Sequence, residues 1–540
     1  MNPSLDLKEL SPEQLREMVV TLQDQISERD RKLEARDTVI AQRDSQITER
    51  DNLLAKRDQS IKHYKIREQQ LTQEIALLRR YQYGRRSEGL SSGQLSLLQE
   101  QIDEDISALE TELEKISVSE KPKTTENKPK RQTLPPELPR TVITHEPDST
   151  TCECGCELQR SGEDVSEKLD YTPGTFQVER HIRGKWTCKR CEGLVQKPIA
   201  PHIIDKGIPT TNLLAQILVS KYADHQPLYR QQQIYARAGV DIPRSTLSDW
   251  VGRCGVELTP LIGRLREVIL QHGVLHADET PVAMLSPGKK RTHRAYVWTY
   301  TTTRYADIPG VVYDFRPSRA GKEVKTFLQD WSGKLVCDDY TGYKALFGEN
   351  ITEIGCMAHA RRKFHDLHVA NHSPMAEKAL VTIGLLYDIE RETADLDAET
   401  RHRIRQNKAK PIIDKLHAWL IGQREKATDG TGLAKAIDYS LKRWTALTRY
   451  LDDGAVPIDN NWVENQIRPW ALGRSNWLFA GSLRSGQRAA NIMSLVQSAK
   501  MNGLDPQAYL KDVMDRLPIT KYSDIDELLP HNWTPTVNTG

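Results

Sequence analysis

A seven-residue repeat near the start of the chain restricts its first part to one kind of structure. Aliphatic side chains recur at every seventh position over residues 19–61, and no proline interrupts the repeat. The repeated positions are Val19, Ile26, Leu33, Ile40, Ile47, Leu54 and Ile61. Residues seven apart share one stripe of an α-helix, so the pattern predicts a long helix that pairs as a coiled coil.

The second core position of each repeat departs from an ideal coiled coil. It is an arginine followed by an aspartate, at Arg29, Arg36, Arg43, Arg50 and Arg57. One aliphatic residue per repeat gives a narrow seam. Residues 1–90 are therefore expected to form a weak or conditional, leucine-zipper-like coiled coil that joins copies of the chain. A single solvated helix with charge pairs along its surface is the alternative.

The 540 residues are long enough for several domains. Residues 117–140 are rich in lysine, proline and threonine, and we expect residues 91–145 to be a basic disordered linker. No apolar run approaches the ~18 residues that span a bilayer. The first residues lack the basic start and apolar run of a signal peptide. These features predict a cytoplasmic protein with no membrane partner.

Cysteines are concentrated in one short part of the sequence. Five of the eight lie in two clusters: Cys152, Cys154 and Cys156, then Cys188 and Cys191. In a reducing compartment this clustering favours a metal site over disulfides. Two knuckles about 30 residues apart predict a zinc ribbon over residues 146–200, with a structural Zn²⁺ held by four thiolates. Cys152, Cys154, Cys188 and Cys191 are the favoured ligands, and Cys156 is the alternate for the first knuckle.

Residues 205–270 have the pattern of several helices. A short turn that contains Gly239 separates two of them, and the second begins with Pro-Arg-Ser-Thr at residues 243–246. This is the shape of a helix-turn-helix, in which Arg244, Ser245 and Thr246 would face DNA. An ordinary helical hairpin is the alternative. The formal net charge is only +2, so a DNA partner must be recognised by locally concentrated positive charge.

From residue 273 the pattern changes to short segments rich in valine, tyrosine and threonine. The expected order is strand, strand, strand, helix, strand, helix, strand, which matches a ribonuclease-H-like core. Such a core has one carboxylate on its first strand, one just after its fourth and one on a later helix. Asp278, Asp338 and Glu464 meet that pattern.

Three carboxylates that converge in space suit phosphodiester chemistry. Two Mg²⁺ (or Mn²⁺) ions can activate the attacking oxygen and stabilise the leaving oxygen, and carboxylate oxygens are the ligands that Mg²⁺ prefers. Each of the three acids has a competing interpretation. Asp278 could simply end a strand. Asp339 stands next to Asp338, and Glu464 could form a capping box with Asn461 at the start of a helix. The capping and metal-binding roles of Glu464 are compatible.

Several motifs together resemble the large DDE transposase of the insertion-sequence-66 family of bacterial mobile elements. They are HADETPV, CDDYTGY, CMAHARRKF and IDNNWVENQIRPWALGRSNWLFAGS, with YGRRSE, GEDVSEKLDYTPGTFQVERHIRGKWTCKRC and LLPHNW elsewhere. The resemblance covers almost the whole chain. It implies that Asp278, Asp338 and Glu464 are the catalytic acids, although Asp339 stands where the family usually has glycine.

The resemblance also implies an overall organisation and a set of partners. A catalytic domain over residues 271–490 would contain a helical insertion at about 374–450, followed by a helical region over 491–540. Cys356 and His359 form a C-x2-H pair that is incomplete as a zinc site. The DNA partners would be terminal inverted repeats and target DNA, in the bacterial cytoplasm and nucleoid, with accessory transposition proteins. Phosphate-binding arginines would include Arg361, Arg362, Arg468 and Arg474.

Two other functions fit parts of this sequence. An inactive, transposase-derived protein would bind the same DNA without cutting it. A ribonuclease-H-like nuclease would hydrolyse DNA without joining ends.

Overall fold

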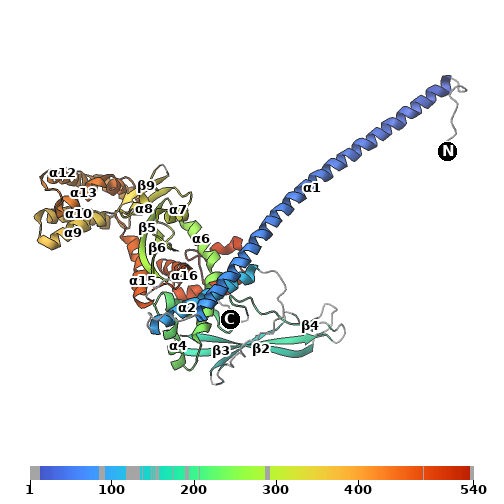
Figure 1. Ribbon diagram of the computed structural model, residues 1–540, viewed down its shortest axis with the longest axis horizontal. Helices are drawn as coiled ribbons and strands as arrows, with labels where there is room; N and C mark the ends of the chain where they lie inside the picture. The colour runs from blue at the N-terminus through green and yellow to red at the C-terminus, as the bar shows by residue number, and fades with distance from the viewer. Residues whose placement is uncertain are drawn as a thin grey trace. The chain divides into compact units, whose positions relative to one another are not determined.

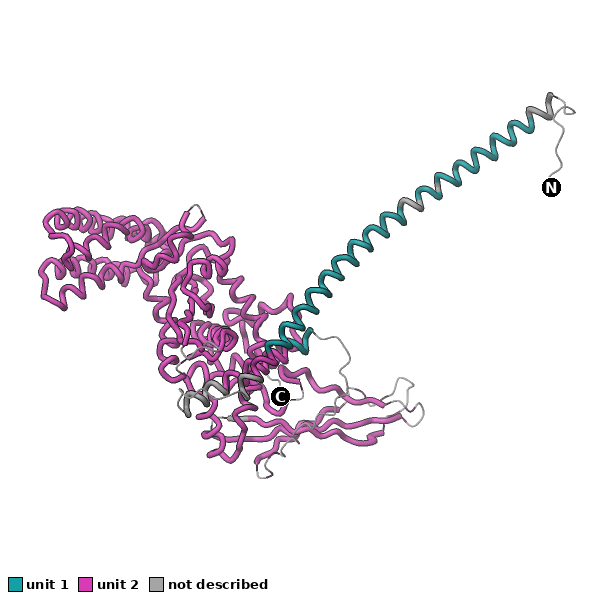
Figure 2. Tube along the Cα trace, viewed as in Figure 1, with its two compact units in different colours: residues 1–74, 113–119 teal, residues 75–112, 120–540 magenta. Residues whose placement is uncertain are grey.

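The computed structural model divides the chain into two compact units (Figure 1, Figure 2). Unit 1 comprises residues 1–74 and 113–119, and unit 2 comprises residues 75–112 and 120–540. The structure describes residues 12–83, 92–116 and 134–535, apart from 135, 137, 147, 148, 150, 152–156, 158, 173, 189–191, 193, 206, 286–291, 349 and 478. Within these residues, no helix is both long enough and apolar enough to cross a membrane.

Helix α1 (Pro12–Tyr83) supplies nearly all of the described part of unit 1 and is 72 residues long. Six aliphatic residues of the repeat are exposed along it, namely Val19, Ile26, Leu33, Ile47, Leu54 and Ile61. The predicted long helix is confirmed. Pairing with a second copy stays a prediction, and this exposed seam is the surface that pairing would bury.

Helix α2 (Ser92–Ile116) corrects the prediction of a disordered linker over residues 91–145. Its Ile102 and Leu109 are buried in unit 2, and so are Glu100, Glu104 and Asp105. The buried carboxylates meet lysine and arginine side chains that lie more than 100 residues further along the chain. Composition alone cannot show this compensation. Residues 140–145 also have regular structure, as strand β1, whereas residues 117–133 lie outside the described part.

A four-stranded sheet follows, in the order β1-β3-β2, with β4 paired to β3. Its strands are β1 (Arg140–His145), β2 (Gln159–Thr172), β3 (Thr175–Thr187) and β4 (Leu194–Val195). Strands β2 and β3 form a long antiparallel hairpin. Cys188 directly follows β3 and is buried. The other predicted zinc ligands, Cys152, Cys154, Cys191 and the alternate Cys156, lie outside the described residues, so the zinc ribbon stays a prediction.

Residues 205–270 form the expected helices. They are α3 (Thr211–Tyr222), α4 (Leu228–Arg237), α5 (Arg244–Glu257) and α6 (Thr259–Ile269). Gly239 has φ +92 in the turn between α4 and α5, a left-handed conformation that favours glycine. Pro243 occupies the N-cap position of α5, and Leu247 and Val251 bury one face of that helix. The pair α4–α5 fits both the predicted helix-turn-helix and an ordinary helical hairpin, so the DNA-binding role of this pair stays a prediction.

A five-stranded sheet forms the centre of unit 2, in the order β7-β6-β5-β8-β9. The strands are β5 (Val274–Met284), β6 (His293–Thr302), β7 (Val311–Arg316), β8 (Gly333–Cys337) and β9 (Ile351–Gly355). Strand β6 runs antiparallel to β5 and β7, whereas β5, β8 and β9 are parallel. Helix α7 (Gly321–Leu328) precedes β8, and the short helix α8 (Thr341–Lys344) follows it. The predicted order of strands and helices is confirmed.

The expected insertion over residues 374–450 is helical. Helix α9 (Met357–Asn371) leads into α10 (Pro374–Glu392), α11 (Ala398–Ile404), a π-helical turn (Arg405–Ala409), α12 (Lys410–Lys426), α13 (Gly432–Lys442), α14 (Trp444–Thr448) and a 3₁₀ turn (Arg449–Asp452). Helices α9, α10, α12 and α13 pack around a common core (Figure 1). The fully buried Arg405 donates to Glu390 and to the carbonyls of Tyr450, Asp453 and Val456, which anchors the chain that leads back to the sheet.

The last helices cover the sheet. They are α15 (Asn461–Trp477), α16 (Leu483–Met501) and α17 (Pro506–Arg516), followed by 3₁₀ turns at Leu517–Ile519 and Tyr522–Leu528. Helix α16 packs on β7, where the Ser494 hydroxyl accepts from the backbone N–H of Tyr313 at 2.9 Å. This helix begins well before residue 491, the predicted start of a C-terminal region.

Candidate functional site

Two of the predicted acids occupy equivalent positions on neighbouring strands. Strands β5 and β8 are parallel, and the last paired residues of their register are His276 and Val336. Asp278 and Asp338 each lie two residues beyond that pair. Since adjacent strands are about 4.8 Å apart, the two acids lie side by side at one edge of the pairing.

Glu464 approaches from helix α15, which packs against β5 and β6. The helix is tied to the sheet by Trp462, whose indole N–H donates to the Thr302 carbonyl at 3.0 Å. Glu464 lies in the first turn, where its carboxylate is 4.0 Å from His359 Nε2 and 3.7 Å from Arg362. A strand, a strand end and a helix start thus place the three acids near enough for the charges of Asp338 and Glu464 to act on Asp278.

The surroundings of Asp278 oppose its ionisation. Burial raises the pKa of Asp278 well above its usual range, and the charges of Glu279, Asp338 and Glu464 raise it further. In the described part of the chain, neither Asp278 nor Asp338 is in an ion pair. A divalent cation bound by carboxylate oxygens would relieve this repulsion. The donors therefore fit Mg²⁺ in type and charge, although no three metal-binding side chains among the described residues form a closed cluster.

Asp339 has other partners. Its exposed carboxylate pairs with Arg443 at 2.8 Å and with Lys344 at 3.0 Å. Asp338 instead accepts a hydrogen bond from the backbone N–H of Tyr340 at 2.9 Å, and it is one of the acids that raise the pKa of Asp278. This arrangement favours Asp338 as the acid of the site.

Four family models match the chain and cover most of its length. The description "Transposase IS66 family" matches residues 206–488, and "IS66 C-terminal element" matches 494–531. A model described as "Transposase C of IS166 homeodomain" matches 70–143, and "zinc-finger binding domain of transposase IS66" matches 149–192. The chain belongs to the IS66 transposase family.

Three relatives from Sinorhizobium fredii (strain NBRC 101917 / NGR234) are similar to this chain over most of its length, and their names describe no function. Uncharacterized protein y4jD is 38% identical over 74% of this chain and 81% of its own length. Uncharacterized proteins y4qI and y4hP are 36% and 34% identical, over 86% and 85% of this chain and 89% and 88% of their own lengths.

The family defines coarse properties of this IS66 transposase. Its homeodomain and zinc-finger regions imply that DNA is a partner, and the zinc-finger match over residues 149–192 implies a structural zinc. The DDE family match implies a transposition enzyme that uses a divalent metal. The homeodomain match includes α2, in the segment that the sequence assigned to a linker.

The start of α15 differs from the predicted capping box of the transposase. Asn461 is the first helical residue and not the cap, and its backbone N–H donates to the Asp459 carboxylate at 3.1 Å. The Glu464 carboxylate is oriented toward α9. The capping interpretation of Glu464 is therefore wrong, because Asp459 already satisfies the N–H that Glu464 would have accepted.

Glu279 is a site residue that the sequence analysis missed. Only 1% of its side chain is exposed, and it contacts Arg319 at 2.5 Å and the Tyr343 hydroxyl at 2.9 Å. Burial raises the pKa of Glu279, and the Arg319 hydrogen bond opposes that rise. Arg319 also stacks on Tyr340, 3.7 Å from the ring centroid. The HADET motif could have indicated this, because adjacent strand residues point to opposite faces of the sheet. Asp278 and Glu279 must therefore lie in different surroundings.

The C-x2-H pair contacts the acid site and belongs to no group of three or more metal-binding side chains among the described residues. Cys356 is buried at the N-cap of α9, and its sulfur accepts from the backbone N–H of Asn460 at 3.2 Å. Burial raises the pKa of the Cys356 thiol to about 12, so it stays protonated. His359, one turn further, faces Glu464.

The basic residues after Glu464 have different environments. Arg468 is exposed one turn beyond Glu464. Arg474 is also exposed, but its guanidinium donates to the Pro281 carbonyl at 3.0 Å. Arg484 pairs with Glu112 at 2.9 Å, and Arg488 is buried against Glu104 and Asp105 at 2.7 and 3.0 Å. Helix α2 therefore neutralises part of the positive charge that the sequence displays.

Other predicted DNA contacts lie on helix surfaces. Arg361 and Arg362 are exposed on α9, next to the acid site through Arg362. Ser245 is exposed in the first turn of α5, and Arg244 and Thr246 are partly exposed there. Their contacts with DNA stay predictions.

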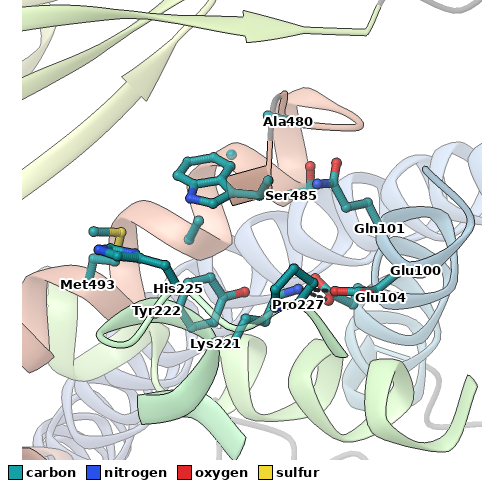
Figure 3. Close-up of a pocket in the computed structure, with 13 residues that line it drawn as sticks. Glu100, Gln101, Glu104, Lys221, Tyr222, His225, Pro227, Ala480, Ser485 and Met493 are labelled. Carbon is teal, nitrogen blue, oxygen red and sulfur yellow. Dashed lines mark hydrogen bonds and ion pairs between the residues drawn. The ribbon is translucent and has the colours of Figure 1, made fainter. Parts of the chain in front are cut away.

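A pocket in unit 2 is lined by other residues than these acids (Figure 3). It lies where α2 meets α3 and α16, and Lys221 points toward the carboxylates of Glu100 and Glu104 (Figure 3). Its charged groups are paired with one another, so we assign it to the packing of α2.

Proposed function

We propose that this chain is a DNA transposase that binds the terminal inverted repeats of an insertion sequence and catalyses metal-dependent DNA cleavage and strand transfer. The observation that carries the proposal is the grouping of Asp278, Asp338 and Glu464. The ionisation of Asp278 is opposed by burial and by neighbouring acids, and no cationic side chain among the described residues pairs with it, so this carboxylate is suited to bind a metal ion.

The strand order supports a ribonuclease-H-like core for the catalytic domain at residues 271–490. Three antiparallel strands, β7, β6 and β5, continue into the parallel strands β8 and β9. In that arrangement the first and fourth strands are neighbours; the first carries Asp278, and Asp338 directly follows the fourth. The helical insertion at 374–450 extends from this core.

In the proposed site Asp278, Asp338 and Glu464 would hold two Mg²⁺ or Mn²⁺ ions. Such ions, when bound, supply activation of the attacking oxygen and stabilisation of the leaving oxygen. In cleavage, a water oxygen attacks the terminal phosphorus and the P–O3′ bond breaks, which leaves a 3′-hydroxyl and a 5′-phosphate. In strand transfer, that 3′-hydroxyl attacks a target phosphodiester, and the target's own O3′ departs. Arg362 and Arg468 would offset phosphate charge near these steps.

The other regions would hold the DNA and assemble the complex. We assign a structural Zn²⁺ to Cys152, Cys154, Cys188 and Cys191, with Cys156 as the alternate for the first pair. The first turn of α5 would contact DNA through Arg244, Ser245 and Thr246. The exposed seam of α1 would join copies of the chain.

The test is cleavage and joining of a labelled duplex that carries the element's end, with Mg²⁺. We expect Glu464→Gln and Asp278→Asn to reduce cleavage by more than about 100-fold, beyond the loss usual for residues that only orient a metal ligand. Asp339→Asn is the matched control, because Asp339 is exposed and paired elsewhere, and it should cut within a few-fold of wild type.

Three results would contradict the proposal. Wild-type protein that binds the end without cutting it would indicate an inactive DNA-binding protein. Cutting without joined product would indicate a nuclease that only hydrolyses. Equal cutting by Glu464→Gln and wild type would show that Glu464 is not one of the catalytic acids.

A further inference from the structure

Asn460 is a fully buried polar residue that immediately precedes α15. Its side chain makes two hydrogen bonds to strand β5: Oδ1 lies 2.7 Å from His276 Nδ1, and Nδ2 donates to the Ala277 carbonyl at 3.0 Å. Its backbone N–H donates to Cys356 Sγ at 3.2 Å. Its carbonyl accepts from the backbone N–H of Glu464 at 3.3 Å. One residue thus joins β5, α9 and α15.

These contacts fix the orientation of the Asn460 amide and the tautomer of His276. The Ala277 carbonyl can only accept, so the amide nitrogen of Asn460 must face it and the amide oxygen must face His276. That oxygen needs a donor, so the proton of the buried His276 lies on Nδ1. Turning the amide over would set two oxygens against each other and leave buried groups unpaired, which is costly.

The network lies directly between two acids of the site. The Ala277 carbonyl belongs to the peptide group that ends at the nitrogen of Asp278. The Asn460 carbonyl accepts from the backbone N–H of Glu464, the residue that carries the third carboxylate. A displacement of Asn460 therefore moves the backbone of Asp278 and the backbone of Glu464 relative to each other.

Helix capping does not explain the Asn460 side chain. A capping asparagine turns its side-chain oxygen onto an N–H in the first turn of its own helix. The Asn460 side chain points instead to a strand more than 180 residues earlier in the sequence, and Asp459 accepts from the first N–H of α15.

We propose that Asn460 is a positioning residue that sets the separation of the Asp278 and Glu464 carboxylates for a divalent cation. This inference rests on the proposed function. Asn460 acts through backbone groups on both sides and does not itself touch the metal or DNA. His276 supports it by holding the amide in one orientation.

The first experiment measures Mn²⁺ binding to the full-length protein by electron paramagnetic resonance of the free ion. Sites that disappear in Glu464→Gln define the acid site. We expect Asn460→Ala to weaken Mn²⁺ binding there by about 10- to 100-fold, the range seen when a residue that orients a metal ligand is removed. Asn461→Ala is the matched control, since the exposed Asn461 amide donates to Asp459 and to no other described residue, and it should bind as wild type does.

A second pair of variants separates positioning from simple loss of folding. His276→Asn keeps a donor near the position of Nδ1, whereas His276→Leu removes it. We expect His276→Leu to shift Mn²⁺ binding in the same direction as Asn460→Ala, and His276→Asn to restore most of the affinity. Circular dichroism and thermal unfolding without metal would check that each variant is folded.

The outcomes distinguish this inference from the proposed function. Folded Asn460→Ala or His276→Leu protein that binds Mn²⁺ with wild-type affinity would overturn the positioning role and leave the proposed function intact. Wild-type protein with no Mn²⁺ site that depends on Glu464 would overturn the proposed function, and the inference with it.

Discussion

At the scale of the residue, burial of a titratable side chain links stability to pH. His181 on β3 is 9% exposed and stacks on His145, with His145 Nε2 3.0 Å from His181 Nδ1. Burial lowers the pKa of His181 to about 4, helped by the charges of Lys168, His145 and His202. Glu179, 3.3 Å away, is the acid that faces it.

The sign of the pH effect follows from this depressed pKa. Below about pH 6.5 the unfolded chain binds a proton at His181 and the folded protein does not, so stability falls as the pH drops toward 4. Between pH 7 and 4.5 we expect wild type to lose about 2 kcal/mol more unfolding free energy than His181→Asn. Urea unfolding at both pH values measures this, with the exposed His365→Asn as control. Parallel losses in wild type and His181→Asn would contradict the expectation.

The candidate acids could be predicted from the sequence, but the residues that contact and orient them could not. Each acid falls at a characteristic point of the sequence pattern. Asp278 lies on a predicted strand, Asp338 follows another strand, and Glu464 lies at a helix start. The role of Asn460 depends on contacts across 183 and 184 residues of chain, and no local spacing encodes them. The same reason explains why Glu279 and its partner Arg319 were missed.

At the scale of the element, helix α2 depends on buried ion pairs. The Arg488 side chain is 4% exposed and contacts Glu104 and Asp105, whose side chains are each 2% exposed. Removal of one partner from such a group leaves an uncompensated buried charge. We expect Arg488→Met to lower the unfolding free energy of the protein by about 3–5 kcal/mol.

Helix α16 offers a matched control for that prediction. Arg484, four residues earlier, pairs with Glu112, and both side chains are more exposed, at 22% and 28%. Arg484→Met should therefore cost at most about 1 kcal/mol. Thermal and urea unfolding of both variants would measure the difference, and equal losses would show that α2 is not held by the buried pairs.

The elements themselves could be predicted where they follow a local pattern. The strands and helices of residues 273–371 follow alternation and helical spacing closely enough to give their order. Helix α2 could not be predicted in this way, because an acidic segment next to a lysine- and proline-rich stretch has the composition of a linker. Its stability comes from Lys221 and Arg488, which only the folded chain brings near.

At the scale of the whole molecule, assembly of copies of the chain is part of the proposed function. The seam on α1 is the feature suited to this role, because its aliphatic residues are exposed in the single chain. A narrow seam should pair reversibly and depend on protein concentration. The family match shows a transposase, and pairing through this seam stays a prediction.

Three substitutions on the seam test whether it assembles the protein. In the full-length chain, the triple variant Ile47→Asp, Leu54→Asp and Ile61→Asp places charges at consecutive seam positions. The control triple, Ser45→Asp, Asn52→Asp and Gln59→Asp, adds the same charges on the outer face of the same turns. Buried charge opposes pairing, whereas exposed charge does not. Light scattering after size exclusion should therefore show an oligomer for wild type and control and a monomer for the seam variant. If the seam variant has the same mass as wild type, α1 is a single solvated helix and any assembly uses another surface.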